Sequence, residues 1–561
     1  MCGFLGVVNP SIDLERFEAG ISVIASRGPD HLGTYQDSRV CLGHRRLAIV
    51  DLDERSNQPF VSKCGGYVML FNGEIYNFKE LQAILLDHGI NMRTNSDTEV
   101  LLELYIFMGA SFLNLLRGMF AIVIYDQKRA MIYGFRDPLG IKPLYYHHGE
   151  KGFVFSSQVR AISRYLNSKL DFNEKALLSY KILGSIPDSD TMFNEIFSLS
   201  HGNSLEYSIM NDSLKLNHEE YIFENNYRKE KIYSIDKLCS LVESELMKSV
   251  EYHSLSDVPV AVFLSGGLDS AFLAMALKNY TNDVVGITIN FQEIENGAWN
   301  EVNRASKIAE ALGIRHEVKT ITMHDFEKDV ENILMSIDQP THDGVNTYYA
   351  SKFARELGFK VVLSGVGGDE LLLGYDFYRT PSILVDNSIF RLALKLSGNL
   401  IDYKSGILKY SFDNWVYYWL LRRSKRENDA KCFVEFKKYF FEKLGDINLD
   451  LFDKQSLQKL DINFYLRNQL LRDSDWSSMA NSIELRTPFV DYRLYESVLP
   501  LYSSLNKFKK QQIMKRIMKG KISSEVLSAK KTGFYIPIND WSNQLFGMDW
   551  HDKVENHFYG E

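Results

Sequence analysis

The sequence predicts a two-domain α/β protein in which a strand-rich part precedes a part where strands and helices alternate. Its 561 residues are too many for one ordinary core. A polar segment at 211–234, rich in Asn, Glu and Lys, has the composition of a connector. We therefore expect domains at 1–228 and 235–561, with the boundary near Lys229.

The first domain is expected to contain stacked sheets with helical outer layers. Strand-like runs occur at 40–50, 67–71, 119–125, 131–135 and 153–155. Two helical patterns interrupt them, at 78–88 and 97–108, and apolar residues recur at helical spacing in the second. Strand pairs beside paired helices are typical of a layered sandwich.

The second domain is expected to contain a parallel sheet with crossover helices. A strand at 258–264 leads into a helix at 271–279, and a strand at 284–290 leads into a helix at 301–312. A helix at 347–357 then leads into a strand at 360–363. We predict that the remaining, mostly helical part wraps this sheet.

The composition favours small-molecule substrates. A net charge of -8 without a long acidic or basic block disfavours nucleic acid and anionic membranes as partners. The chain lacks a signal-like start and any run near 18 uninterrupted apolar residues, about the length that spans a bilayer, which disfavours secretion and membrane spanning.

The cysteines favour a reducing cytoplasm. The chain has five, an odd number without a Cys-x-x-Cys pair, which argues against a disulfide framework and a structural zinc site. Their positions are Cys2, Cys41, Cys64, Cys239 and Cys432. The oligomeric state stays open, with a homodimer as one prospect.

Cys2, followed by Gly3, is a candidate nucleophile. If Met1 is removed, one residue carries both a thiol and an α-amino group, whose ordinary pKa of about 7.7 to 8.0 suits a base near neutral pH. The thiol then needs no distant histidine to accept its proton.

The run from Leu264 to Ser270, LSGGLDS, follows a predicted strand and opens a helix. Adjacent glycines let the backbone approach an anion, and the helix N-terminus supplies positive potential, so we expect a phosphate site. Asp269 beside a phosphate is reasonable if it holds Mg²⁺. The spacing differs from that of P-loop and dinucleotide-binding motifs.

SGGLDS after a strand resembles the pyrophosphate loop of ATP pyrophosphatases, and Cys2-Gly3 resembles the start of class II glutamine amidotransferases. Their combination in this order resembles glutamine-hydrolysing asparagine synthetases over nearly the whole chain. The resemblance implies an N-terminal Ntn-hydrolase αββα sandwich and a C-terminal ATP-pyrophosphatase domain.

Four motifs of the first domain carry this resemblance: RGPD at 27–30, HRRL with IVD at 44–51, FNGEIYN at 71–77 and SDTE at 96–99. Arg46 offers a fork for the glutamine carboxylate, whereas Glu74 and Asp97 offer carboxylates for its ammonium. Asn72 and the Gly73 N–H would stabilise the oxyanion formed when Cys2 attacks. By resemblance, Ile49 and Val50 also belong to the glutamine site.

In the second domain, SGVGGDE at 364–370 forms a second glycine-rich turn after a strand. By resemblance, Asp369 is a second magnesium ligand beside Asp269, and Lys531 in KKTGF neutralises charge on the phosphates and intermediate. The segment 478–491 resembles the helix and turn that close the synthetase pocket. The ATP-binding residues implied are Leu264, Ser265, Gly266, Gly267, Asp269, Ser270, Ile289, Ser364 and Gly365.

Three departures concern the acceptor. Val366 replaces a usual acidic residue, and valine can neither accept a proton nor hold a cation. The segment 339–347, which contains His342, lacks the threonine and arginine pattern that grips aspartate in the family. Leu373 replaces a glycine of the usual LFGGY.

The reaction implied has two halves, glutamine hydrolysis at Cys2 and ATP-dependent activation of a carboxylate as an acyl-adenylate, with AMP and pyrophosphate released. Family resemblance implies an internal ammonia channel. The amide acceptor is aspartate, or a related acid such as a uronic acid sugar. A ring closer resembling β-lactam synthetase is disfavoured because the glutaminase residues are present. The remaining alternative is a glutamine- or nucleotide-binding regulator without catalysis.

Overall fold

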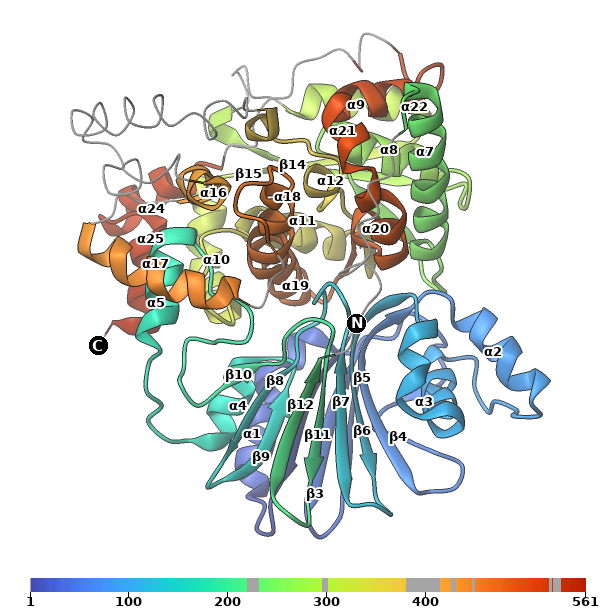
Figure 1. Ribbon diagram of the computed structural model, residues 1–561, viewed down its shortest axis with the longest axis vertical. Helices are drawn as coiled ribbons and strands as arrows, with labels where there is room; N and C mark the ends of the chain where they lie inside the picture. The colour runs from blue at the N-terminus through green and yellow to red at the C-terminus, as the bar shows by residue number, and fades with distance from the viewer. Residues whose placement is uncertain are drawn as a thin grey trace.

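In the computed structural model, a β-sandwich lies below a domain built around one parallel sheet (Figure 1). The structure describes residues 2–218, 232–294, 301–379, 414–424, 430–445, 449–523, 527 and 536–560. The expected boundary near Lys229 lies outside the described residues.

Two six-stranded antiparallel sheets form the sandwich. In spatial order, the first contains β10 (Phe197–Ser198), β8 (Tyr145–Gly149), β9 (Gly152–Ser156), β1 (Cys2–Val8), β3 (Val40–Arg46) and β2 (His31–Gln36). The second contains β12 (Ser213–His218), β11 (Asn203–Ser208), β7 (Met131–Arg136), β6 (Gly118–Asp126), β5 (Tyr67–Ile75) and β4 (Phe60–Val61).

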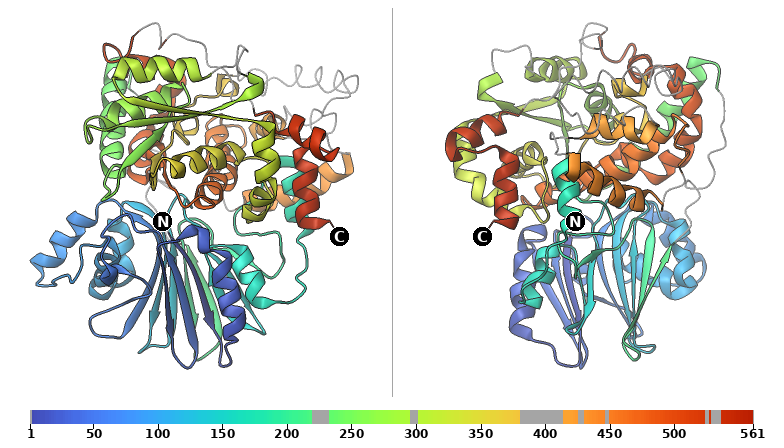
Figure 2. Two further views of the ribbon diagram at one scale, coloured as in Figure 1. Left: turned by 180° about the vertical axis from the view of Figure 1, so that it is seen from behind. Right: turned by 60° about the vertical axis from the view of Figure 1, so that its left-hand side comes forward.

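Helices cover the outer face of each sheet. α1 (Leu14–Val23) and α4 (Val159–Leu166) pack on the first sheet, and α2 (Phe78–Asp87) and α3 (Asp97–Met108) pack on the second. Apolar side chains of both sheets, including Phe4, Leu70 and Val123, fill the space between them. Figure 2 shows the resulting layers, which confirm the expected αββα sandwich.

α3 begins as its sequence predicts. The hydroxyl of Ser96 caps the helix by accepting a hydrogen bond from the N–H of Thr98, and Asp97 and Glu99 place negative charge at the positive end of the helix dipole. Among the described residues, Asp97–Leu115 is the segment apolar and long enough to span a membrane by those two measures alone. Here it packs on the second sheet.

The second domain contains a five-stranded parallel sheet, and this confirms the α/β prediction. In spatial order its strands are β15 (Arg315–Ile321), β14 (Val285–Phe291), β13 (Val260–Phe263), β16 (Val361–Leu363) and β17 (Glu484–Arg486). The helices α8 (Leu268–Leu277), α9 (Glu301–Leu312) and α11 (Val345–Glu356) pack against these strands.

The described part of the chain after β16 is mostly helical and surrounds this sheet (Figure 1). A π-helix, η6 (Asp461–Leu471), leads directly into α19 (Arg472–Met479). The other main helices of the domain are α7 (Ile235–His253), α10 (Met323–Ser336), α12 (Gly368–Leu371), α16 (Trp415–Arg423), α17 (Ala430–Leu444), α18 (Ser456–Leu460), α20 (Tyr492–Val498), α21 (Tyr502–Lys507), α22 (Lys510–Ile517), α24 (Ile538–Phe546) and α25 (Trp550–Tyr559).

Helix α5 (Glu174–Leu183) belongs to the first part of the sequence but packs with the second domain. It lies beside α17 and α25, as Figures 1 and 2 show. Tyr180 shares an apolar cluster with Ile289 and Trp541, and its hydroxyl donates to the carbonyl of His551 over 3.1 Å. The N-terminal region therefore extends an arm onto its neighbour.

Two local predictions need correction. The segment 478–491 is not only helix and turn, because Glu484–Arg486 is the edge strand of the parallel sheet. The proposed connector begins later than 211, because β12 pairs with β11 up to His218. β17 pairs with the distant strand β16, which stabilises a three-residue segment without a strand pattern of its own. β12 instead forms a hairpin with the preceding strand β11.

Candidate active sites

Cys2 begins β1 at the junction of the two domains (Figure 1). It pairs in register with Arg46 of β3, and its side chain is buried. Its backbone N–H donates to Oδ1 of Asn72 over 3.1 Å. Burial raises the pKa of the Cys2 thiol, so a base is needed to produce the thiolate near neutral pH.

The cavity beside Cys2 collects most of the residues assigned to glutamine. Gly73 belongs to β5, where a Cβ atom would approach the carbonyl oxygen of Met119 to 2.1 Å, so only glycine fits. The predicted residues that line the cavity are Arg46, Ile49, Val50, Gly73, Glu74 and Asp97.

Two buried polar atoms near this cavity have unsatisfied hydrogen-bonding capacity. Within the part of the chain that the structure describes, Nδ2 of Asn72 and Oε1 of Glu74 are buried without a hydrogen-bond partner. A buried unpaired donor or acceptor is costly, and such atoms gather where a ligand completes them. One atom can donate to an oxyanion, and the other can accept from an ammonium.

Asp97 starts α3, and one of its carboxylate oxygens accepts from the N–H of Ile75 over 3.1 Å. Burial raises its pKa to about 6. Burial, together with the charge of Asp97, raises the pKa of Glu74 well above its ordinary value. A substrate ammonium would favour the ionised form of both carboxyl groups.

A buried arginine of the second domain reaches the glutamine cavity. Nη2 of Arg486, on β17, lies 3.4 Å from Oε2 of Glu74, and its Nε donates to Glu484 over 2.6 Å. The carbonyl oxygen of Arg486 accepts from the N–H of Ser364 over 2.8 Å. Arg486 thus contacts Glu74 of the glutamine cavity with its side chain and Ser364 of the synthetase cavity with its carbonyl oxygen.

The expected phosphate loop follows β13 and leads into α8. Gly266 has a φ of 71°, in the left-handed region that favours glycine. Oγ of Ser270 accepts from the N–H of Ser265 over 3.2 Å, and this contact closes the turn. All predicted ATP-binding residues except Gly266 line one cavity of about 370 Å³, and Ile289 is among them. That volume is within the usual range for small-molecule sites, about 300 to 1,000 Å³.

Asp269 and Asp369 converge in this cavity, as expected of two ligands to one cation. Nζ of Lys510 lies 2.6 Å from an oxygen of each carboxylate. Gly368 permits the approach, because a Cβ atom there would meet Cγ of Asp269 at 2.9 Å. Although burial opposes it, the two carboxylates raise the pKa of Lys510, so the ammonium stays charged.

The donor set fits Mg²⁺, which prefers carboxylate, phosphate and water oxygens. Asp269 and Asp369 would hold the ion. Within the described residues no group of three or more His, Cys, Asp or Glu side chains gathers to hold a metal, so phosphate oxygens and water would supply the remaining ligands.

Lys510 was missed by the motif reading, which assigned the cationic role to Lys531. Lys531 lies outside the described residues. Lys510 starts α22 far along the chain from both aspartates, and its position in the sequence shows no motif of known chemistry. What identifies Lys510 is its positive charge between two carboxylates, and this arrangement exists only in the folded chain.

The three residues that depart from the family pattern lie in different parts of the second domain. Val366 lines the synthetase cavity together with Asn346 and Thr347. His342 instead packs against Tyr180 and His551, at the arm that carries α5. Leu373 is buried with a φ of 55°, which explains why glycine suits this position and indicates local backbone strain.

Comparisons with known proteins agree with this two-site arrangement. The glutamine amidotransferase domain family matches residues 1–221, and the asparagine synthase family matches residues 241–552. Asparagine synthetase [glutamine-hydrolyzing] 1 of Bacillus subtilis is 30% identical, over 96% of this chain and 88% of that protein.

Two further relatives show the breadth of the similarity. Asparagine synthetase [glutamine-hydrolyzing] 3 of Bacillus subtilis is 28% identical over 95% of this chain and 87% of its own length. Amidase chry2 of Gibberella zeae is 25% identical over 94% of this chain and 86% of its own length. The chain belongs to the glutamine-hydrolysing asparagine synthetase family, and it is an ATP-using, glutamine-dependent ligase.

Proposed function

We propose that the enzyme amidates a carboxylate through an acyl-adenylate and releases AMP and pyrophosphate. The observation that carries this proposal is the convergence of Asp269, Asp369 and Lys510 beside the phosphate loop. The ammonium of Lys510 would stabilise the departing pyrophosphate. Mg²⁺, when bound by the two aspartates, would offset further phosphate charge.

We propose that Cys2 attacks the side-chain amide of glutamine and forms a thioester, with release of ammonia. Arg46 would hold the substrate carboxylate, and Glu74 with Asp97 would hold its ammonium. Nδ2 of Asn72 and the N–H of Gly73 would stabilise the oxyanion. The unpaired buried donor on Asn72 supports this assignment.

The base in this proposal is the α-amino group of Cys2 after removal of Met1. It accepts the thiol proton directly or through one water molecule. The intact mass of the protein purified from its host tests the processing step, because removal of the initiator lowers the mass by one methionine residue.

The proposed ammonia path follows the apolar interface between the domains. Leu47, Met119 and Ile141 of the sandwich share one buried cluster with Val262 and Leu264 of the second domain. Such a path would keep ammonia unprotonated and away from water. The apolar cluster supports the proposal of such a path between the two sites.

Aspartate is the first acceptor to test, because the family contains aspartate-amidating enzymes. A uronic acid sugar is the second, and it is favoured by Val366 in the cavity wall and by His342 packing away from it. Neither side chain offers a charged clamp for an amino acid, whereas Asn346 and Thr347 can hydrogen-bond hydroxyl groups.

A screen of acids tests the proposal. Purified protein with glutamine, ATP and Mg²⁺ should release pyrophosphate in amounts equal to the amide formed, and only with an accepted acid. Failure to release pyrophosphate with every acid, while glutamine is hydrolysed, would contradict adenylation. If Cys2→Ala changes neither glutamine use nor ammonia-driven synthesis, the result would favour the alternative of a non-catalytic glutamine- or nucleotide-binding regulator.

A cytoplasmic location is also part of the proposal. Cys2, Cys41, Cys64 and Cys239 are free thiols in the described part of the chain, which suits a reducing compartment. Cell fractionation with an antibody against the protein would test this.

A further inference from the structure

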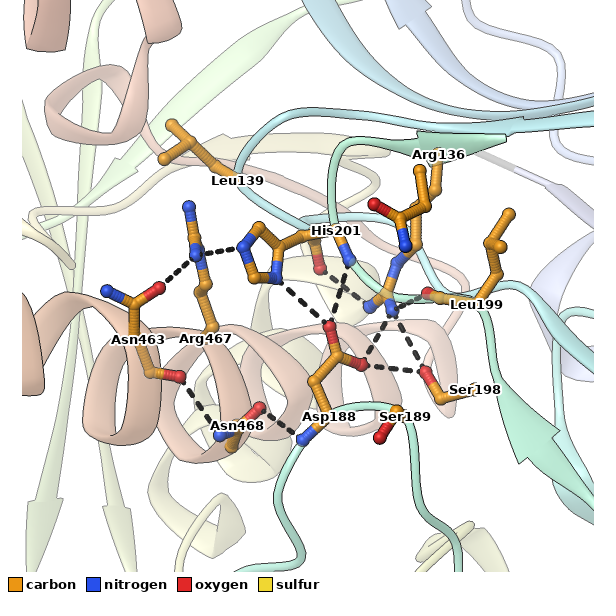
Figure 3. Close-up of polar contacts among 12 residues, drawn as sticks. Arg136, Leu139, Asp188, Ser189, Ser198, Leu199, His201, Asn463, Arg467 and Asn468 are labelled. Atoms are coloured by element: carbon orange, nitrogen blue, oxygen red, sulfur yellow. Dashed lines mark hydrogen bonds and ion pairs between the residues drawn. The ribbon is translucent and has the colours of Figure 1, made fainter. Parts of the chain in front are cut away.

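The contact between the domains includes a buried polar cluster at the base of the α5 arm (Figure 3). After α5 the chain returns to the sandwich through Asp188. One carboxylate oxygen of Asp188 accepts from Nη1 of Arg136 over 2.9 Å and from Oγ of Ser198 over 2.8 Å. The other accepts from the N–H of His201 over 3.0 Å.

Asp188 remains ionised in this cluster. Although burial opposes it, the guanidinium of Arg136 holds the pKa of Asp188 well below its ordinary value. Arg136 is itself oriented by the carbonyl oxygens of Lys142 and Gly140, at 2.8 and 3.0 Å. The sandwich therefore presents a rigid, charged surface to its neighbour.

The π-helix η6 of the second domain contacts this polar cluster. Nη1 of Arg467 contacts Nε2 of His201, and its Nη2 donates to the carbonyl oxygen of Pro138 over 3.1 Å. Oδ1 of Asn468 accepts from the N–H of Asp188 over 3.1 Å. Two consecutive residues of η6 thus bind the same polar cluster.

The contact with Arg467 needs one particular protonation state of His201. A guanidinium can only donate hydrogen bonds, so Nε2 of His201 must present its lone pair. The single ring proton is then on Nδ1, which lies 3.3 Å from Oδ2 of Asp188. A second proton would set an N–H against the guanidinium, so the contact requires neutral histidine.

η6 links this contact to the synthetase cavity. Leu470, three residues after Arg467, lines that cavity. The start of η6 is anchored, since Asp461 accepts from Nε1 of Trp419 over 2.6 Å and from Nε of Arg423 over 2.8 Å. π-Helical turns are often found at functional sites. One helix therefore connects the contact between the domains to the wall of the synthetase cavity.

We propose that Arg467 is a positioning residue that couples ammonia delivery to amide synthesis, and that it acts through neutral His201. This inference rests on the proposed function. Protonation of His201 releases Arg467 and loosens the contact between the domains. Among the residues that the structure describes, the charged groups that contact the ring are Asp188 and Arg467, and Arg136 bonds Asp188. Histidine is the side chain that changes charge between about pH 5 and 8.

The test measures amide formed per glutamate released from pH 6 to 8.5. For wild type this ratio should fall on the acid side. Arg467→Met keeps the length of the side chain but removes its donors, and it should lower the ratio about threefold to tenfold at every pH, because loss of a buried charged hydrogen bond weakens docking by roughly that factor or more. Glutamine hydrolysis and ammonia-driven synthesis should each stay within about twofold.

His201→Gln separates protonation from structure. The glutamine amide can accept from Arg467 and donate to Asp188, and it is uncharged throughout this range. Its ratio should stay high and independent of pH. Arg493→Met is the matched control, because Arg493 also spans the domains, donating to the carbonyl oxygen of Asn114 over 2.9 Å. It should behave like wild type.

Hydrogen–deuterium exchange gives a readout that needs no substrate. After correction for the intrinsic effect of pH, peptides covering η6 should exchange faster at pH 6 than at pH 8 in wild type but not in His201→Gln. An unchanged ratio in Arg467→Met, or an equal acid decline in His201→Gln, overturns the inference. If no amide forms with any acid, the exchange result still decides the contact, and the proposed function alone fails.

Discussion

The two sites manage polar groups in opposite ways. In the glutamine cavity, Nδ2 of Asn72 and Oε1 of Glu74 are buried and unpaired within the described structure. In the synthetase cavity, Lys510 bonds both Asp269 and Asp369. The first site has donors and acceptors prepared for a substrate, whereas the second has both of its carboxylates bonded to a lysine of the protein.

This difference predicts different responses to substitution. Sheet register places Cys2, Asn72 and Glu74, so single changes there should stop one half-reaction and leave the other intact. Charge balance organises the second site, where the proposed Mg²⁺ would share the two carboxylates with Lys510. Changes there should disturb adenylation but leave glutamine hydrolysis alone.

The largest expected effect is that of Cys2→Ala. Loss of the nucleophile should lower glutamine hydrolysis by at least about 10³-fold. Synthesis driven by added ammonia should remain within about twofold of wild type, since the second site is untouched. Glutamate release measures the first quantity and amide formation the second; a parallel loss of both would show that the sites are not separable in this way.

Asn72→Ala should follow. Removal of one oxyanion donor typically costs about 10²- to 10³-fold in turnover. We expect kcat for glutamine hydrolysis to fall by that factor with a smaller change in KM, because the contact forms mainly in the transition state. Asn211→Ala, at an exposed site, is the control. An effect confined to KM would argue that Asn72 only binds substrate.

Lys510→Met tests the other side of the comparison. It removes the ammonium that bonds Asp269 and Asp369, and we expect pyrophosphate release to fall about 10²-fold. Glutamine hydrolysis should stay near the wild-type rate. Lys521→Met removes an exposed lysine that pairs with Glu243 and should change neither activity. Normal pyrophosphate release by Lys510→Met would remove the lysine from the reaction.

The smallest expected effect is a pH dependence of glutamine binding. Burial raises the pKa of Asp97 to about 6, so its proton is bound below that pH and the charge that attracts the substrate ammonium is lost. One pH unit below the pKa leaves about a tenth of the groups ionised, so KM for glutamine should rise about tenfold between pH 7.5 and 5. Asp97→Asn should show a high KM that varies little over this range; if it keeps the wild-type profile, another group titrates.

Local patterns predicted much of the fold. The helices at 97–108 and 301–312 have the expected bounds; Ser96 caps the first, and both carry acidic side chains in their first turn. β17 escaped prediction because three residues with two charged side chains have no pattern of their own. The packing of α5 on the second domain was also not predicted, because the apolar face of a helix does not indicate which domain covers it.

The same distinction applies to the sites. Residues of one short motif, such as those around Asn72 and Asp269, were assigned from the sequence, and their roles stay proposals. Lys510 and Arg467 carry no motif, and their importance depends on partners hundreds of residues away. Such contacts arise from tertiary structure, where charge and geometry combine segments that no sequence window contains.

The most direct test of the account follows nitrogen from one site to the other. Glutamine labelled with ¹⁵N in its side-chain amide is supplied with ATP, Mg²⁺, unlabelled ammonia and an accepted acid, and the product amide is analysed by mass spectrometry. We predict ¹⁵N enrichment well above that of the bulk ammonia, together with AMP and pyrophosphate in amounts equal to the product. Enrichment equal to that of the bulk ammonia would contradict direct transfer between the sites.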